Sequence, residues 1–158
     1  MVRLADLTEW ESDLALKKKR EFTGFLQGRR WVKARPLYQL RIALITSAGL
    51  HRIGDRPFSD GAGASEYRVI QGDVSGSDLV MSHLSSNFDR SGFQQDVNVV
   101  FPLDRLRELA ADGVVGEVAD FHYAFNGSAP VATLEAPARQ VAAMLKKDRV
   151  DAVLLTPV

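Results

Sequence analysis

Apolar and polar positions along the chain follow two different periods, and together these periods predict alternating helices and strands. Residues 4–22 and 101–113 place apolar side chains at helical spacing with charged residues between them. Residues 133–150 are amphipathic and end in cations, which the helix macrodipole favours. Strand-like runs occupy the remaining intervals, at residues 39–51, 67–73, 78–83, 114–125 and 150–155.

This order of elements predicts an α/β fold. Because strands alternate with helices and several strands are continuously apolar, we expect a three-layer sandwich with a mainly parallel sheet, flavodoxin-like or Rossmann-like. The pattern predicts an N-terminal helix and a surface connection in residues 1–38 and the α/β domain in residues 39–158. Residues 150–155 show no alternation, so we expect this last strand in the interior of the sheet.

Composition narrows the classes of function. The 158 residues suit one compact domain, and 20 basic side chains balance 20 acidic ones, which argues against nucleic-acid binding. The one basic run, Lys17 to Arg20, lies among acidic residues and predicts a solvated helix face. No apolar stretch approaches the ~18 residues that span a bilayer, and no signal core is present, so we expect a cytoplasmic protein without a membrane partner.

The chain contains no cysteine. It therefore has no disulfide framework, no thiolate metal site and no thiol nucleophile within these residues. The three histidines are too scattered to form a metal-binding spacing, so we predict no metal site.

Polar residues follow three of the predicted strands. If those strands are parallel neighbours, their carboxyl ends share one edge, where open α/β sheets bind ligands. The sequence then predicts a small polar pocket. The residues concerned are Thr46 and Ser47 after the first strand, His83, Asn87, Asp89 and Arg90 after the second, and Thr156, Pro157 and Val158 after the last.

Each of these residues also has a structural interpretation. His83 is either a base or a hydrogen-bonded structural histidine. Asp89 and Arg90 form either a binding pair or a local ion pair in a turn, and Asn87 is typical of a turn cap.

Three stretches carry a resemblance to a known family. They are "ALITSAGLHRIGDRPF", "MSHLSSNFDRSGFQQDVNVVFPLDRLRELAADGVVGEVADFHYAFNG" and "VDAVLLTPV". They resemble the selenoprotein B family of glycine, sarcosine, betaine and D-proline reductases. The resemblance covers roughly residues 39–158, and the first 38 residues carry little of it.

The resemblance implies a reductive cleavage of a carbon–nitrogen bond. Family members continue past the last stretch with a selenocysteine or cysteine, then a proline and a further cysteine. That selenol or thiol attacks the α-carbon of a substrate held by a pyruvoyl-bearing partner subunit, and a dithiol/disulfide couple supplies electrons. An ionised selenol is the reactive form, as a thiolate is.

The family pattern also leads to an expectation about the C-terminus. Selenocysteine is encoded by UGA, normally a stop codon, and the sequence ends at Val158, where the resemblance places the nucleophile next. We therefore expect the nucleophile just after Val158 in a longer protein, and no cofactor within these residues. His83 is then the candidate catalytic group, Thr46 and Ser47 line the rim nearest the nucleophile, and Asn87, Asp89 and Arg90 bind a substrate carboxylate or order their loop.

Two other functions stay open at this point. One is a non-catalytic α/β module that binds a small polar ligand or a partner subunit. The other is a hydrolase or racemase-like enzyme that uses His83 as its base. Expected partners are a small-molecule substrate, reductase subunits and a thiol reductant, and an uncovered apolar flank favours self-association.

Overall fold

The computed structural model describes residues 3–23, 32–59, 64–83, 90–127 and 129–158. By internal contacts the chain divides into two units, Met1–Ala34 and Arg35–Val158, each described here by itself. The first unit contains a 3-10 turn, η1 (Leu4–Asp6), and the helix α1 (Glu9–Thr23). Glu11 and Thr8 form a reciprocal cap at the start of α1, because the Thr8 amide donates to the Glu11 carboxylate at 2.9 Å.

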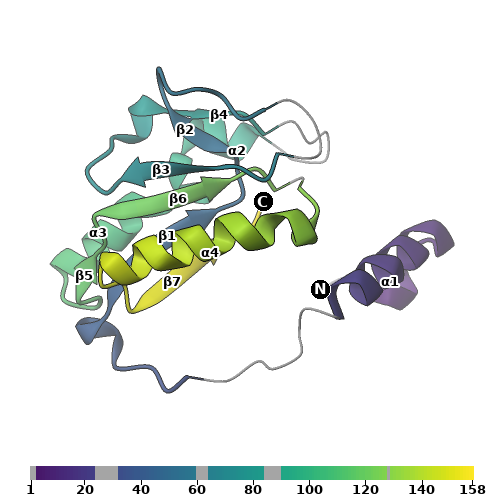
Figure 1. Cartoon of the computed structure of the whole chain (residues 1–158), viewed down its shortest axis with the longest axis horizontal. Helices are drawn as coiled ribbons and strands as arrows, with labels where there is room; N and C mark the ends of the chain where they lie inside the picture. Colours follow the sequence, from purple (N-terminus) through teal and green to yellow (C-terminus); the bar gives the residue numbers. More distant parts are fainter. Residues whose placement is uncertain (1–2, 24–31, 60–63, 84–89, 128) are drawn as a thin grey trace. The chain divides into compact units, whose positions relative to one another are not determined.

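The second unit contains the sheet and the remaining helices (Figure 1). Its strands are β1 (Arg41–Thr46), β2 (Leu50–Arg52), β3 (Tyr67–Gln71), β4 (Leu79–Met81), β5 (Glu117–Val118), β6 (Phe121–Phe125) and β7 (Ala152–Thr156). Its α-helices are α2 (Ser91–Gln95), α3 (Leu103–Ala111) and α4 (Val131–Lys147), with 3-10 turns η3 (Leu37–Gln39), η4 (Gly76–Asp78) and η5 (Val97–Val99).

Strand β1 is the centre of the main sheet. It pairs in parallel with β5 and β6, and also with β7. Ile42 is level with both Val118 and Ala152, so β5 and β7 lie on opposite edges of β1. Strand β3 joins β6 in the antiparallel sense, and β2 and β4 form a separate antiparallel pair.

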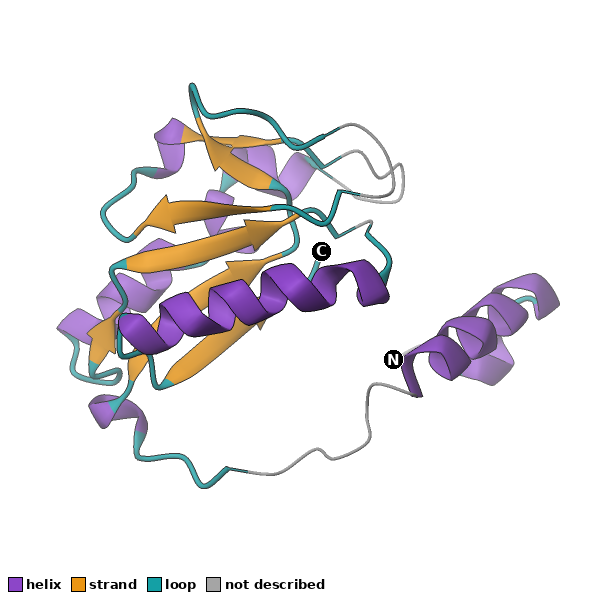
Figure 2. Ribbon diagram, viewed as in Figure 1, coloured by secondary structure: helices purple, strands orange, loops and turns teal. Residues whose placement is uncertain are grey.

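Helices cover both faces of the main sheet. Figure 2 shows α4 across one face and α3 behind the other. Val141 anchors α4, and Leu103 and Leu106 anchor α3 in the core. Fully burying a leucine side chain contributes about 1.5–3 kcal/mol, so these contacts hold the helices to the sheet.

The expected α/β class is confirmed, but the finer expectation is not clearly reproduced. The sheet is mixed and curled, because β3 runs antiparallel and β2 and β4 stand apart, so it is not a plain flavodoxin-like or Rossmann-like sandwich. Among the described residues, β7 pairs with β1 alone and therefore lies at an edge, where Leu154 and Leu155 are 44% and 65% exposed. The prediction of an interior position was wrong, because an apolar run does not by itself tell which neighbours cover a strand.

Several boundaries differ from those expected. The predicted helix over residues 4–22 breaks into η1 and α1, and the polar segment after β4 contains the short helix α2. None of the helices that the structure describes is both long enough and apolar enough to cross a membrane.

Candidate functional site

The carboxyl ends of β1, β6 and β7 meet at one edge of the sheet. Thr46 is level with Ala124 on one side and with Thr156 on the other. We call the residues at this level or just past it the carboxyl rim; they are residues 46–49, 125–127 and 156–158. Parallel pairing is the cause, since it puts equivalent ends of neighbouring strands side by side.

Ser47 joins two strand ends within the carboxyl rim. Its Oγ accepts a hydrogen bond from the Val158 amide at 2.8 Å, and its own amide donates to the Thr156 carbonyl at 3.2 Å. The Gly127 amide donates to the Ser47 carbonyl at 3.0 Å. Ser47 therefore fixes the backbone of β7 and of the segment after β6 at the same point.

The two threonines of the carboxyl rim have structural partners. Thr46 is 1% exposed, and its Oγ1 accepts from the Ala48 amide at 3.1 Å. Thr156 Oγ1 donates to the Val100 carbonyl at 3.0 Å, which ties β7 to the segment before α3. Both hydroxyls thus shape the rim on either side of Ser47.

Gly49 brings the end of β4 to the carboxyl rim. Its φ of 65° lies in the left-handed region, and its carbonyl accepts from the Ser82 amide at 2.9 Å. A Cβ at Gly49 would lie 3.1 Å from the His83 amide nitrogen, so only glycine fits without a shift. The close approach places His83 beside the end of β1.

His83 is buried, and Arg90 lies against it. Arg90 Nη2 donates to the His83 carbonyl at 2.5 Å. Burial first, and then the positive charge of Arg90, lower the pKa of His83. The imidazole is therefore neutral near pH 7, the form in which it can accept a proton.

The structure thus gathers most of the sequence-predicted residues at one edge. They are Thr46, Ser47, His83, Arg90, Thr156, Pro157 and Val158. Asn87 and Asp89 lie outside the described residues. The roles assigned to all of these residues stay predictions.

Sequence reasoning missed His122, which is fully buried on β6. Its Nδ1 accepts from the Leu44 amide at 2.9 Å, near the break in pairing between β5 and β6. Its Nε2 has no hydrogen-bond partner among the described residues, and its ring meets Phe101 edge-on at 5.7 Å. Burial lowers the pKa of His122 to about 4, and Arg107 adds to the effect.

No sequence pattern indicated the charged network at the amino ends of the strands. The guanidinium of Arg41 is almost buried and contacts Asp148 at 2.5 Å, Glu117 at 2.5 Å and Asp120 at 3.0 Å. Burial works to lower the pKa of Arg41, but the hydrogen bonds to these carboxylates outweigh it and raise the pKa above its usual value. The partners are far apart in sequence, so no local pattern marks them.

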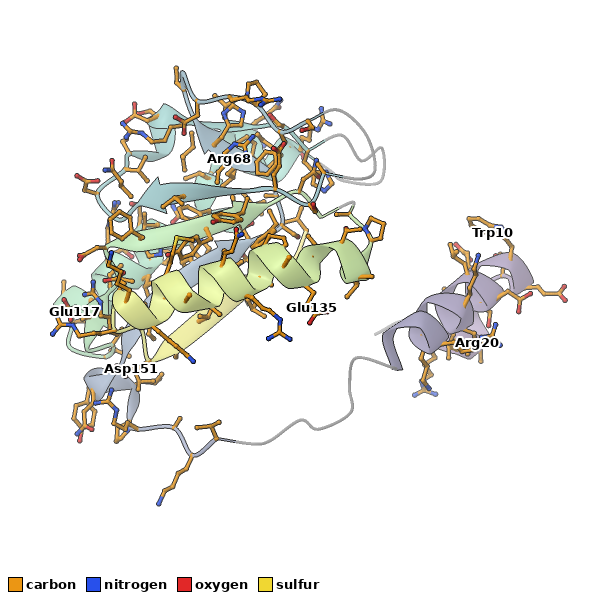
Figure 3. The ribbon with its side chains drawn as sticks, in the orientation of Figure 1. Trp10, Arg20, Arg68, Glu117, Glu135 and Asp151 are labelled. Atoms are coloured by element: carbon orange, nitrogen blue, oxygen red, sulfur yellow. The ribbon has the colours of Figure 1, made fainter. Side chains whose placement is uncertain are left out.

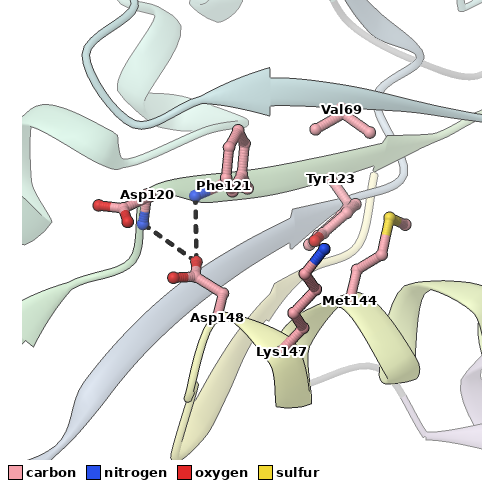
Figure 4. Close-up of a pocket in the computed structure, with 7 residues that line it drawn as sticks. All are labelled: Val69, Asp120, Phe121, Tyr123, Met144, Lys147 and Asp148. Atoms are coloured by element: carbon pink, nitrogen blue, oxygen red, sulfur yellow. Dashed lines mark hydrogen bonds between the residues drawn. The ribbon is translucent and has the colours of Figure 1, made fainter.

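A pocket of about 380 Å³ opens beside this network, between α4 and the sheet (Figure 4). Asp148 forms one wall, and its Oδ2 accepts from the amides of Asp120 and Phe121 at 3.1 and 3.3 Å. Burial, aided by the Asp148 charge, raises the pKa of Tyr123, so this lining phenol stays protonated. The other lining residues are Val69, Met144 and Lys147.

The pocket and the carboxyl rim lie at opposite ends of β6. Phe121, its first residue, lines the pocket, whereas Phe125, its last residue, belongs to the rim. In the described ranges no group of three or more histidines and carboxylates is arranged to hold a metal ion.

The chain is similar to subunits of several reductase complexes. The D-proline reductase subunit gamma of Acetoanaerobium sticklandii is 36% identical over 122 residues, which cover 76% of this chain and 49% of that protein. The glycine reductase complex component B subunit gamma of Symbiobacterium thermophilum is 37% identical over 125 residues, covering 76% of this chain and 29% of that protein. The sarcosine reductase complex component B subunit beta of Peptoclostridium acidaminophilum is 29% identical over 125 residues, covering 75% and 28%.

The chain thus spans about half the length of the first relative and under a third of the other two. No solved structure matches it. The family model for glycine/sarcosine/betaine reductase selenoprotein B matches residues 26–158, which include the whole carboxyl rim. The chain belongs to the glycine/sarcosine/betaine reductase selenoprotein B family.

Proposed function

We propose that the chain forms the substrate-side part of a reductase-complex subunit. The complex cleaves a carbon–nitrogen bond in a small amino-acid-like substrate, of the class of glycine, sarcosine, betaine or D-proline. A dithiol/disulfide couple is the electron partner, and a further subunit of the complex holds the substrate amine. The observation that carries this proposal is the family match over residues 26–158 together with the convergence of rim residues from β1, β4, β6 and β7.

The reaction consumes two electrons and two protons. Two thiols supply both and become a disulfide. The carbon–nitrogen bond of the substrate breaks, one hydrogen replaces nitrogen on the α-carbon, and the other leaves with the amine. A selenol or thiol that attacks the α-carbon first divides this change into two easier steps.

We propose that this nucleophile follows Val158 in the longer protein. The hydrogen bond from the Val158 amide to Ser47 Oγ supports the position, because it fixes the backbone one residue before the nucleophile.

Two residues beside the carboxyl rim, His83 and Arg90, fit supporting roles. A neutral His83 can take the proton of the selenol and then, as the imidazolium, give it to the leaving amine. Arg90 carries a cation beside His83, and a guanidinium binds a carboxylate in a bidentate geometry. A substrate carboxylate held by Arg90 would place its α-carbon at the same edge as Val158.

The test compares the 158-residue chain with the protein extended, from its own gene, through the first selenocysteine or cysteine codon after Val158. Both are assayed with the other subunits of the complex, dithiothreitol, and glycine, sarcosine, betaine or D-proline in turn. We expect only the extended protein to release amine or open the proline ring, with one disulfide formed for each bond cleaved. Turnover by the 158-residue chain, or no turnover of any of the four substrates by the extended complex, would contradict the proposal.

One observation favours a second function, a module that binds a small ligand without catalysis. The pocket beside Asp148, here called the amino-end pocket, lies at the opposite end of β6 from the carboxyl rim. It is large enough for a small molecule. Under this alternative, ligand binding would depend on Lys147 and Tyr123, and replacing Ser47 would leave it unchanged. Calorimetry with Lys147→Met and Ser47→Ala distinguishes the two functions.

A further inference from the structure

Helix α1 carries one face that stays uncovered by the described part of its own unit. Trp10 is 72% exposed and Leu14 is 39% exposed. Trp10, Asp13, Leu14, Lys17 and Arg20 line a single groove of about 370 Å³ along the helix. Their spacing of three and four residues puts them on one stripe of the helix, because 3.6 residues complete a turn.

A helix of this kind requires a partner surface. Isolated helices shorter than about 12–15 residues are marginal in water, and burying an apolar face is what usually stabilises them. Helix α1 has 15 residues and presents an exposed tryptophan. The groove therefore presents a face that a partner can cover, and its charges indicate which partner fits.

The charges of the groove are self-complementary. Its acidic residue, Asp13, lies in the amino-terminal half, and its basic residues, Lys17 and Arg20, lie in the carboxyl-terminal half. When two copies of α1 pack antiparallel with Ala15 at the centre, Asp13 of one copy is level with Lys17 of the other. The same register sets Trp10 against Arg20, so one arrangement satisfies both pairs.

We propose that α1 docks against α1 of a second copy of this chain, forming an antiparallel helix pair. Asp13 and Lys17 form two symmetric ion pairs, and each Arg20 guanidinium stacks on the Trp10 ring of the other copy. The two Leu14 side chains meet beside the two-fold axis. Figure 3 shows Trp10 and Arg20 projecting from α1.

The test uses charge reversal in the full 158-residue chain. In Asp13→Lys the substituted lysine of each copy faces Lys17 of the other, and in Lys17→Asp the substituted aspartate faces Asp13. We expect each variant alone to dissociate about tenfold more readily than the wild type in sedimentation equilibrium. An equimolar mixture of the two variants restores opposite charges across the pairs, and we expect it to associate as heterodimers.

The mixing experiment separates this proposal from a charge pair within one helix. Asp13 and Lys17 are four residues apart, so reversing either also alters α1 itself, which circular dichroism measures. Mixing leaves each helix unchanged, so recovery on mixing requires contact between copies. Glu135→Lys is the control, because it reverses an acidic side chain on α4, where Glu135 pairs with Arg139 at 2.7 Å.

Three results would overturn the proposal. They are a wild-type chain that stays monomeric, with or without a blue shift of the Trp10 emission, a mixture that does not recover association, and a Glu135→Lys loss as large as that of Asp13→Lys. Trp31→Phe isolates the Trp10 emission for the first of these measurements. The proposal concerns assembly alone, so its outcome is independent of the reductase activity.

Discussion

The two ends of the parallel strands use different chemistry. At the carboxyl rim, small hydroxyls such as Ser47 bond to backbone groups. At the amino ends, the nearly buried Arg41 binds three carboxylates and holds β1 to the segments around it. One end is therefore held by a network of charged side chains, whereas the other is held by short-range hydrogen bonds between hydroxyls and the backbone.

The largest loss of stability is expected from breaking the Arg41 network at the amino ends of the strands. Arg41→Met leaves the carboxylate of Asp148, whose side chain is 10% exposed, without its cation. We expect a loss of about 3 kcal/mol in the free energy of unfolding, because an unpaired buried charge is costly. Urea denaturation measures it. Arg139→Met, at an exposed pair with Glu135, should change stability by less than about 1 kcal/mol, and equal losses would contradict the assigned difference.

The second effect depends on pH and on His122. Its pKa is lowered from 6.5 to about 4 in the folded chain, so folding favours the neutral ring. The stability it contributes is complete above pH 6.5 and is lost as the pH falls toward 4, by about 3 kcal/mol in all. Denaturation of wild type and His122→Leu across this range gives the measurement. If the free energy of unfolding depends on pH equally in the wild type and in His122→Leu, His122 does not cause that dependence.

A third effect concerns the approach of β4 to the carboxyl rim. Gly49→Ala places a Cβ at a φ of 65° and 3.1 Å from the His83 amide nitrogen. We expect a cost of about 2 kcal/mol. Gly113→Ala is the control, because its φ is 72° and nothing lies within 4 Å of its Cβ position. If both variants lose the same stability, the contact with His83 contributes nothing.

The smallest expected effect lies at the centre of the carboxyl rim. Ser47→Ala removes the acceptor for the Val158 amide, at a cost of about 1 kcal/mol. In the extended protein we expect Ser47→Ala to lower turnover by more than this loss of stability accounts for, because the nucleophile would lose its fixed position. Ser77→Ala removes an exposed hydroxyl that pairs with Ser75 at 2.9 Å, and it should leave both quantities unchanged. A turnover loss no greater than that of Ser77→Ala would remove Ser47 from the site.

Local sequence patterns predicted some of these features and missed others. The α/β class and the gathering of Ser47 and Val158 followed from apolar runs and the polar residues after them. The edge position of β7 did not follow, because pairing partners are set by distant segments. The Arg41 network joins residues up to 107 positions apart, and no short pattern encodes such a contact.

The family resemblance and the residue pattern each indicated the site independently. Polar residues at strand ends indicated an edge, and the family match independently covered the same residues. His122 escaped both, since a lone histidine within an apolar strand carries no spacing signal.

We propose that substrates bind at the carboxyl rim and not at the pocket beside Asp148. The direct measurement is amide chemical-shift mapping of the ¹⁵N-labelled chain during titration with glycine, sarcosine, betaine and D-proline. We expect at least one substrate to shift the amides of Ser47, Gly49, Gly127 and Val158. Shifts confined to Phe121, Lys147 and Asp148, or no shifts with any of the four, would contradict it.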